Sequence, residues 1–450
     1  MKRFPFILAA LLLCILNVSA QQHILHTFKK VQLTDQFWSE GANFGDFNHD
    51  GKIDIVCGPF WYEGPDFKKR HEYYPADKSF VHKKSDGTDE KIPGFEGALG
   101  IKNNYSDNFL TFVYDFNHDG WSDVLVYGWP GLEAYWYENP KGGTGLWQRH
   151  LMLKVVDNES PTFGDINGDG KPDIICNSGG YFGYATADWE HPMEPWTFHP
   201  ISPKGDWQRY THGLGFGDIN GDGRVDILEK DGWWEQPASL AGDPVWKFHP
   251  YPFAPEHGSS QMFAYDVNGD GKADVICSLA AHGYGLAWFE QTNNARDEIT
   301  FIKHIILNEQ TANDKPAAPN PYGVSFSQLH AVDLIDMNGD GLKDIVTGKR
   351  FWAHGHAGPD PDSDGVPVLY WFELSRKGHQ VEFIPHLIDD NSGVGTQVIA
   401  GFIQNKKYPD IVVGNKRGCF VFLHQTKKVS KSTWENAQPI RVLESDTTNR

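Results

Sequence analysis

An acidic nine-residue pattern, D-x-N-x-D-G-x-x-D, occurs six times in this sequence, and its residue types suit a metal ion. Oxygen ligands at positions 1, 3, 5, 7 and 9 are those that a hard cation prefers, and glycine at position 6 permits the sharp turn. The regular recurrence favours structural calcium, up to six ions, over regulatory calcium. The predicted calcium ligands are Asp46, Asn48, Asp50, Asp54, Asp115, Asn117, Asp119, Asp123, Asp165, Asn167, Asp169, Asp173, Asp218, Asn220, Asp222, Asp226, Asp266, Asn268, Asp270, Asp274, Asp336, Asn338, Asp340 and Asp344.

The elements that position these loops repeat with them. An apolar strand precedes each loop, and a β-branched strand such as DIICN follows it. An aromatic run with an acid comes next, as WYE (61–63, 136–138), DWE (188–190), WWE (233–235) and WFE (288–290, 371–373). The fourth strand ends in a histidine whose recurrence favours a structural role, at His150, His199, His249, His304 and His386. Four such strands make one blade of a propeller.

A seventh, degenerate unit spans residues 401–425 and keeps Asp410 but not the acidic loop. Repeats of about 50 residues are typical of propellers and solenoids, and seven units close a ring. The segment HILHTF (23–28) would complete the last blade by pairing with the C-terminal strands. We therefore predict an all-β, seven-bladed β-propeller over residues 21–427 and a polar C-terminal tail over residues 428–450.

The N-terminus has the pattern of a secretory signal peptide over residues 1–20. Lys2 and Arg3 precede an apolar stretch, and Val18-Ser19-Ala20 forms a small-residue cleavage site. We expect export to the periplasm or the cell exterior. No other apolar run is long enough to predict a membrane span. The formal net charge of −19 argues against a nucleic-acid partner, which needs a basic face.

The cysteines predict buried thiols. Cys57, Cys176 and Cys277 each lie three residues after the aspartate that ends an acidic loop, so they occupy equivalent positions in separate repeats. Such positions are not expected to touch, which favours small buried hydrophobes over disulfides or a metal site. Cys14 follows Leu13, where a lipoprotein signal requires a small residue, and this disfavours lipidation.

With these loops inside a seven-fold repeat, the chain resembles the FG-GAP/VCBS family, which includes the integrin α propeller. The resemblance covers about residues 23–426 and implies a propeller whose calcium loops join the first and second strands of each blade, at the bottom. It does not specify a function, because the family includes adhesins, carbohydrate-binding proteins and enzymes. More loosely, the strands W-x-E and W-x-x-H are similar to the propeller part of aldos-2-ulose dehydratase, which acts on ketosugars.

The face opposite the calcium loops, here called the top face, is formed by the segment before each first strand and the loop after each second strand. Six residues before the loops stand Glu40, Phe109, Glu159, His212, Ser260 and His330. Two glutamates and two histidines in one ring favour a site over a solvated funnel mouth. The loops after the second strands contribute Trp129, Lys230, His282, Tyr284, Lys349, Arg350, Lys416 and Arg417.

A possible second metal site lies in the insertion that follows Arg350. His354 and His356 form an H-x-H pair that can ligate zinc or another divalent metal if His330 or His282 supplies a third ligand. The alternative is an exposed lid in which Asp360, Asp362 and Asp364 bind another calcium ion.

These residues favour a carbohydrate-active lyase or dehydratase that performs β-elimination. Lys349, Arg350 and a possible metal would acidify the proton next to a carbonyl or carboxylate. His212, His330 or His282 would act as the base, and Tyr284 or another histidine as the acid. The predicted substrate-binding residues are Glu40, Glu159, Trp129, Lys230, Lys416 and Arg417.

The substrate expected from the dehydratase resemblance is a ketosugar, and the one expected from the cations is a uronic-acid chain. The alternative function is a non-catalytic propeller module that binds a glycan or a protein. The top face concentrates histidine, lysine and arginine in blades 4 to 7 and aromatic residues in blades 1 to 3. This uneven distribution between the blades favours one defined pocket, and hence an enzyme, over a binding platform.

Overall fold

The computed structural model describes residues 23–442, except residues 77–78, 85, 94–105, 144, 256–257, 312, 314, 318–319, 356–357 and 405–406. In this part the chain is all-β, with 29 strands and one short helix. The predicted signal peptide and His356 lie outside the described residues. Within them, no helix combines the length and apolar character needed to cross a membrane.

The strands pair into successive antiparallel sets of four. Among the first three sets, two have a strand in common: β11 closes the second set and opens the third. Their strands are β2 (Ala42–Gly45), β3 (Asp54–Cys57), β4 (Phe60–Tyr62), β5 (Arg70–Glu72), β8 (Leu110–Tyr114), β9 (Asp123–Tyr127), β10 (Leu132–Glu138), β11 (Gln148–Gly164), β12 (Asp173–Ser178), β13 (Tyr181–Thr186) and β14 (Thr197–Pro200). A separate hairpin, β6 (Ser79–Lys83) with β7 (Asp89–Pro93), lies between β5 and β8 in the chain.

Four further sets follow in the same pattern. Their strands are β15 (Leu214–Gly217), β16 (Asp226–Glu229), β17 (Gly232–Glu235), β18 (Lys247–Pro250), β19 (Gln261–Tyr265), β20 (Asp274–Ser278), β21 (Leu286–Asn293), β22 (Ile299–Leu307), β23 (Val332–Ile335), β24 (Asp344–Gly348), β25 (Leu369–Lys377), β26 (Gln380–Asp389), β27 (Val398–Gly401), β28 (Asp410–Asn415) and β29 (Gly418–Val429). The last set is completed by β1 (His23–Thr34), which pairs antiparallel with β29 along its length. The segment HILHTF therefore pairs as the sequence predicts.

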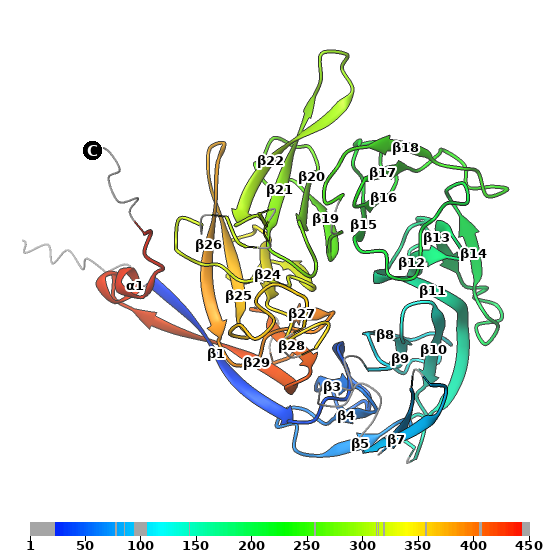
Figure 1. Cartoon of the computed structure of the whole chain (residues 1–450). Helices are drawn as coiled ribbons and strands as arrows, with labels where there is room; N and C mark the ends of the chain where they lie inside the picture. The colour runs from blue at the N-terminus through cyan, green and yellow to red at the C-terminus, as the bar shows by residue number, and fades with distance from the viewer. Residues whose placement is uncertain are drawn as a thin grey trace, which may run out of the picture.

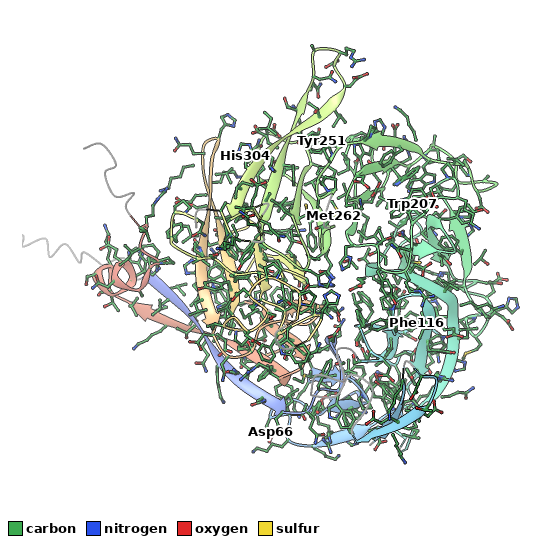
Figure 2. The ribbon with its side chains drawn as sticks, viewed as in Figure 1. Asp66, Phe116, Trp207, Tyr251, Met262 and His304 are labelled. Atoms are coloured by element: carbon green, nitrogen blue, oxygen red, sulfur yellow. The ribbon has the colours of Figure 1, made fainter. Side chains whose placement is uncertain are left out.

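The sets follow one another along a curved path and give a β-propeller-like arrangement (Figure 1). First strands of neighbouring sets lie close together, and β15 and β19 pair in parallel. Gly215 is required for this approach, since a Cβ atom there would lie 2.0 Å from the carbonyl oxygen of Met262. Apolar side chains such as Phe116 fill the space between sets (Figure 2). Cys57, Cys176, Cys277 and Cys419 are buried free thiols, as predicted.

The strand-ending histidines have the same structural role in five of the seven sets. His249 stacks on Trp233 with ring centroids 4.0 Å apart, and its Nε2 contacts Glu235 at 2.6 Å. The same stack with a glutamate contact recurs at His71, His150, His304 and His386. The repetition accounts for both the aromatic and the acidic residue of the W-x-E pattern.

The third set departs from the predicted pattern. The segment DWE (188–190) lies in a turn after β13 and is not the aromatic strand. Tyr184 in β13 stacks on His199, and Thr186 takes the place of the glutamate, with its hydroxyl 2.9 Å from His199 Nε2. The prediction was wrong because Trp189 offered a closer match to the W-x-E pattern than Tyr184 did.

The predicted polar tail is partly ordered against the rest of the chain. β29 extends to Val429, and helix α1 (Lys431–Ala437) follows with Ser430 as its N-cap. Trp434 stacks on His23 with centroids 5.1 Å apart. Beyond the helix, the backbone N–H of Val442 donates to the carbonyl oxygen of Pro321 at 2.7 Å. The tail therefore crosses to the segment before β23.

Candidate functional site

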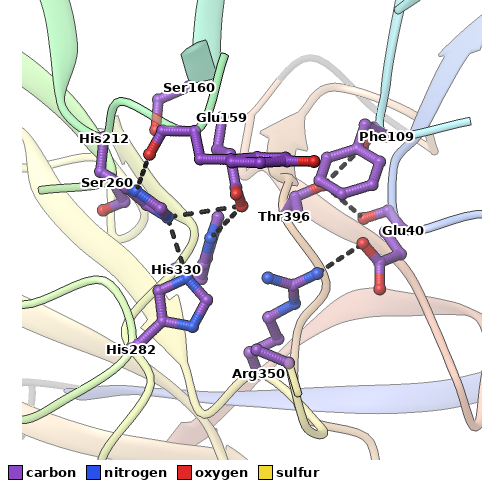
Figure 3. Close-up of polar contacts among 12 residues, drawn as sticks. Glu40, Phe109, Glu159, Ser160, His212, Ser260, His282, His330, Arg350 and Thr396 are labelled. Atoms are coloured by element: carbon purple, nitrogen blue, oxygen red, sulfur yellow. Dashed lines mark hydrogen bonds and ion pairs between the residues drawn. The ribbon is translucent and has the colours of Figure 1, made fainter. Parts of the chain in front are cut away.

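Four side chains from separate segments converge on the top face: Glu159, His212, His282 and His330 (Figure 3). Each offers a ligand atom, and these atoms all lie within 4.8 Å of one another. His212 Nε2 is 2.9 Å from His282 Nε2, and Glu159 Oε2 is 3.1 Å from His330 Nε2. We call these four residues the histidine–glutamate cluster. Three residues that stand six positions before an acidic loop, Glu159, His212 and His330, therefore lie together in the structure.

Local backbone contacts set the position of Glu159 and His212. Glu159 lies in β11 beside Asn158, whose φ of 84° bends the strand. The Glu159 N–H donates to the carbonyl of Thr211 at 2.9 Å, which holds the loop before β15 against β11. Gly258 packs on the other side of His212, where a Cβ atom would lie 2.4 Å from the Cβ of the histidine. A side chain at position 258 would displace His212 from the cluster.

Gln328 joins the segments that carry the other two histidines. Its N–H donates to the carbonyl of Gly283 at 2.6 Å, next to His282, while its own carbonyl accepts from the N–H of Arg350 at 2.9 Å. Its side-chain oxygen accepts from Ala353 N–H at 3.0 Å. The loop after β20, the segment before β23 and the loop after β24 are thus fixed to one another around His330.

Charge and burial make this cluster a set of electron-pair donors. Burial would raise the pKa of Glu159, but His212 and His330 outweigh it and hold that pKa well below its ordinary value. Burial lowers the pKa of His282 to about 4 and that of His330 well below its ordinary value. His212 Nδ1 donates to the carbonyl of Tyr210 at 2.8 Å, and its Nε2 faces the cluster, 2.9 Å from His282 Nε2 and 3.4 Å from Glu159 Oε2. At neutral pH the Glu159 carboxylate therefore faces the neutral imidazoles of His282 and His330.

A buried ion triad lies beside the cluster. Glu40 contacts Arg350 at 2.6 Å and Lys416 at 2.8 Å, and all three side chains are about 1% exposed. Burial lowers the pKa of Lys416 to about 8, and the ammonium group lies 4.8 Å from the ring of Trp352. Figure 3 shows Arg350 between Glu40 and the histidines. Glu40 and Lys416 were predicted to bind substrate, but the structure gives both charges protein partners away from solvent.

Lys349 and Tyr284 both contact Ser327, three residues before His330. Lys349 is fully buried, and its ammonium donates to the Ser327 hydroxyl at 2.8 Å and lies 3.8 Å from Asp362. Burial lowers the pKa of Lys349 to about 8. Tyr284 is also buried, and its backbone forms an isolated bridge with Ser327. Burial raises the pKa of its phenol.

A cavity of about 490 Å³ opens beside His212. Trp207 and Tyr210 line it together with Lys230 and Asp231. Lys230 donates to Asp231 at 2.5 Å, so the cavity contains a fixed ion pair next to two aromatic rings. Of the cluster, His212 is the member that lines this cavity. Trp129 stands next to it, with its ring edge-on to Tyr210 at 5.9 Å.

The insertion after β24 supplies an aspartate to the cluster. Asp360 Oδ1 contacts His354 Nδ1 at 2.9 Å and lies 3.7 Å from His282 Nδ1. His282, His354 and Asp360 form a second group with potential ligand atoms within 4.8 Å of one another. Arg417 lies further out, over the ring of Phe351 at 4.9 Å.

The acidic loops form a regular set away from the cluster, but they are not among the groups whose ligand atoms converge in the described residues. In the first loop, Asp46 accepts from the N–H groups of Asp50 and Gly51 at 3.2 and 3.0 Å. Asn48 also accepts from Asp50 N–H, at 3.0 Å. Equivalent bonds recur in the other loops. The side-chain oxygens are thus held inside each turn.

Three residues of the site were not found from the sequence. Asp360 was considered only as a calcium ligand, because its neighbour His282 is distant in the chain. Trp207 and Tyr210 line the cavity from the segment WQRYTH that leads into His212, and the two aromatic residues before a top-face histidine were a usable signal.

Comparison with known proteins confirms the resemblance to FG-GAP repeats, since residues 115–176 match the FG-GAP-like repeat family. A T-cell immunomodulatory protein homolog of Plasmodium falciparum is 24% identical over 252 residues, which are 49% of this chain and 33% of the relative. The chain thus spans about a third of that relative's length. Among solved structures, an Agrocybe aegerita lectin that recognises non-reducing terminal N-acetylglucosamine aligns over 82% of both chains, with 16% identity and a TM-score of 0.40.

Proposed function

We propose that this FG-GAP-repeat chain is a carbohydrate-active carbon–oxygen lyase that performs β-elimination on a ketosugar or a uronic-acid substrate. The observation that carries the proposal is the convergence of Glu159, His212, His282 and His330 beside a cavity lined by aromatic and polar side chains. Aromatic rings next to fixed polar groups suit a sugar ring, which has apolar faces and a polar edge.

The donor set also fits a divalent transition metal such as zinc. Zinc in catalytic sites takes three protein ligands at about 2.0–2.2 Å and keeps a further position open. Glu159, His282 and His330 would be these ligands, and the 3.1 Å between Glu159 Oε2 and His330 Nε2 is compatible with two ligands of one ion. A bound metal would act as a Lewis acid on the substrate carbonyl or carboxylate and acidify the adjacent C–H.

The chain's own residues supply the remaining steps. His212 lines the cavity, and its Nδ1 is bonded to the Tyr210 carbonyl, so its Nε2 would be the atom that accepts the proton from the substrate carbon and then passes it to the leaving oxygen. Trp207 and Tyr210 would orient the sugar ring, and Lys230 would bind a hydroxyl or carboxylate at the cavity's rim. Tyr284, Lys349 and Arg350 are buried, and we assign them to positioning the segments around His330.

The test uses ketosugars and uronic-acid oligosaccharides and follows the ultraviolet absorbance of a new conjugated double bond. His330→Ala is expected to lose both the metal and at least 100-fold of the activity, since removing a base or a Lewis acid has effects on this scale. His212→Ala is expected to lose comparable activity but to keep the metal. Full activity in both folded variants would contradict the site assignment.

The complete fold, its calcium content and its export are also proposals. We infer a closed, seven-bladed propeller stabilised by up to six calcium ions at the acidic loops, exported by the signal peptide over residues 1–20. The seven four-stranded sets, the pairing of β1 with β29 and the oxygen donors held inside each turn support it.

The alternative is a non-catalytic propeller module that binds a glycan or a protein. The partial similarity to a T-cell immunomodulatory protein homolog favours it. A metal that remains bound without any elimination activity, together with binding of glycans by the wild-type protein, would support this alternative.

A further inference from the structure

Asp360 has a position that the proposed function does not use. It belongs to the insertion after β24, and its carboxylate lies between two imidazoles. One is His282, whose Nε2 faces the cluster and whose Nδ1 faces Asp360. The other is His354, whose side chain is 43% exposed. The ring centroids of the two histidines are 4.6 Å apart, and the rings are nearly parallel.

The contact with the buried histidine is the informative one. His282 Nδ1 is a buried atom without a hydrogen-bond partner among the described residues, and the Asp360 carboxylate stands 3.7 Å from it. A histidine that binds a metal through one nitrogen almost always donates its other N–H to a carboxylate, carbonyl or water. Such a partner fixes the tautomer and the ring orientation and increases the basicity of the ligand.

The carboxylate itself is held in place by the turn that contains it. Asp360 Oδ2 accepts from the backbone N–H of His354 at 3.2 Å, and Oδ1 accepts from the His354 ring at 2.9 Å. Gly355 adopts a φ of 108°, which favours glycine, and Gly358 N–H donates to its carbonyl at 3.0 Å. The turn therefore presents a preformed carboxylate to the histidine–glutamate cluster.

We propose that Asp360 is a positioning residue of the cluster, which acts through His282 to orient it as a metal ligand. In the metal-bound protein, His282 Nδ1–H donates to Asp360, and its Nε2 lone pair faces the metal. His354 is the second partner of the same carboxylate and is not a ligand. The inference rests on the metal of the proposed function but not on the elimination reaction.

The test is titration of the metal-free, full-length protein with cobalt(II), which reports both affinity and ligand geometry through its visible absorption. Asp360→Asn is expected to weaken cobalt binding by about 10–100-fold, the usual effect of removing a carboxylate behind a ligand. The cobalt spectrum should also change, which a purely structural role would not cause. His354→Ala should weaken cobalt binding less than Asp360→Asn does, because the backbone N–H of His354 still holds the carboxylate, and it should keep one-to-one stoichiometry.

A matched control is Asp243→Asn, which removes the carboxylate from another aspartate–histidine pair, at 2.7 Å from His199 Nδ1 and away from the cluster. Its cobalt affinity should be unchanged. Wild-type affinity in Asp360→Asn would overturn the proposal, and so would a larger loss of cobalt affinity in His354→Ala than in Asp360→Asn, because His354 would then be a ligand. A wild-type protein that binds no cobalt overturns both the metal and this inference. One that binds cobalt without elimination overturns only the lyase.

Discussion

Glu40 is the residue on which the charge balance beside the cluster depends. Its carboxylate is paired with two cations, Arg350 and Lys416, and none of the three side chains reaches solvent. Buried charges are costly unless each has a close partner, so removing the shared partner costs more than removing either cation. Because Arg350 also lies near His330 and His282, the carboxylate limits the positive charge near the histidines.

Glu40→Gln is therefore expected to lower the free energy of unfolding by about 3–5 kcal/mol, since it leaves two buried cations without a carboxylate. Lys416→Met keeps the Glu40–Arg350 pair and should cost clearly less. Chemical denaturation of the two variants and the wild type measures the difference. Equal losses in both variants would contradict the central role of Glu40.

For individual residues, the sequence predicted where a side chain lies in the fold better than which side chains it contacts. Counting back from each acidic loop places Glu159, His212 and His330 in equivalent positions, and the structure brings them together. The same count could not show that Glu40 is neutralised inside the protein, because its partners come from repeats more than 300 residues away. Nor could it show the contact of Asp360 with His282, which depends on the path of a non-repeating insertion.

Among the elements, the aspartate that ends each acidic loop joins the first turn of its set to the third strand. In the first set, Asp54 accepts from Phe47 N–H at 2.9 Å and from Gly64 N–H at 2.8 Å. The bond to the second loop residue recurs in the other sets that carry an acidic loop. Asp410 keeps this bonding in the last set, where no acidic loop exists. This aspartate thus has a backbone role that does not require a metal.

Asp410→Ala tests this backbone role without any effect on calcium binding, because the last set has no acidic loop. The variant leaves the buried N–H groups of Ile403 and His424 without their acceptor, and each such group costs about 1–3 kcal/mol. We expect a loss on the order of 3 kcal/mol in the free energy of unfolding, equal with and without a chelator. Asp390→Ala, at an exposed position directly after β26, should change stability by less than about 0.5 kcal/mol. A wild-type stability for Asp410→Ala would contradict the backbone role.

The strands were predictable because each repeat carries the same signals in the same order. Six copies of the loop fix where the second strand begins, and the aromatic and histidine patterns fix the third and fourth. The third set shows the limit, since Tyr184 rather than Trp189 takes the stacking position. Helix α1 was not predicted, because a seven-residue helix with no buried residue gives almost no amphipathic signal.

For the whole molecule, the distribution of charge argues for bound cations. The chain has a formal net charge of −19, and three aspartates stand in each of the six acidic loops. Charges of one sign this close together repel one another and destabilise a compact state. Calcium at the loops would offset this repulsion. Because β1 pairs with β29 and so joins the N-terminal segment to the last set, the stabilisation would extend to the sets as a whole.

Chelation is therefore expected to lower the midpoint of thermal unfolding by several degrees, and calcium alone should restore it. A ligand at 100 times its dissociation constant stabilises by about 2.7 kcal/mol per site. Differential scanning calorimetry with calcium or zinc added back distinguishes stabilisation by metal at the acidic loops from stabilisation by metal at the histidine–glutamate cluster. Restoration by zinc but not by calcium would contradict calcium binding at the loops.

The central claim is that the histidine–glutamate cluster eliminates across a carbon–oxygen bond of a sugar. The most direct measurement is the ultraviolet absorbance of purified, metal-loaded protein mixed with ketosugars or uronic-acid oligosaccharides, run beside His212→Ala. A conjugated double bond is expected to appear with the wild-type protein and at least 100-fold more slowly with the variant. Equal rates for the two proteins, or no new absorbance from a wild-type protein that retains its metal and binds the sugar, would contradict it.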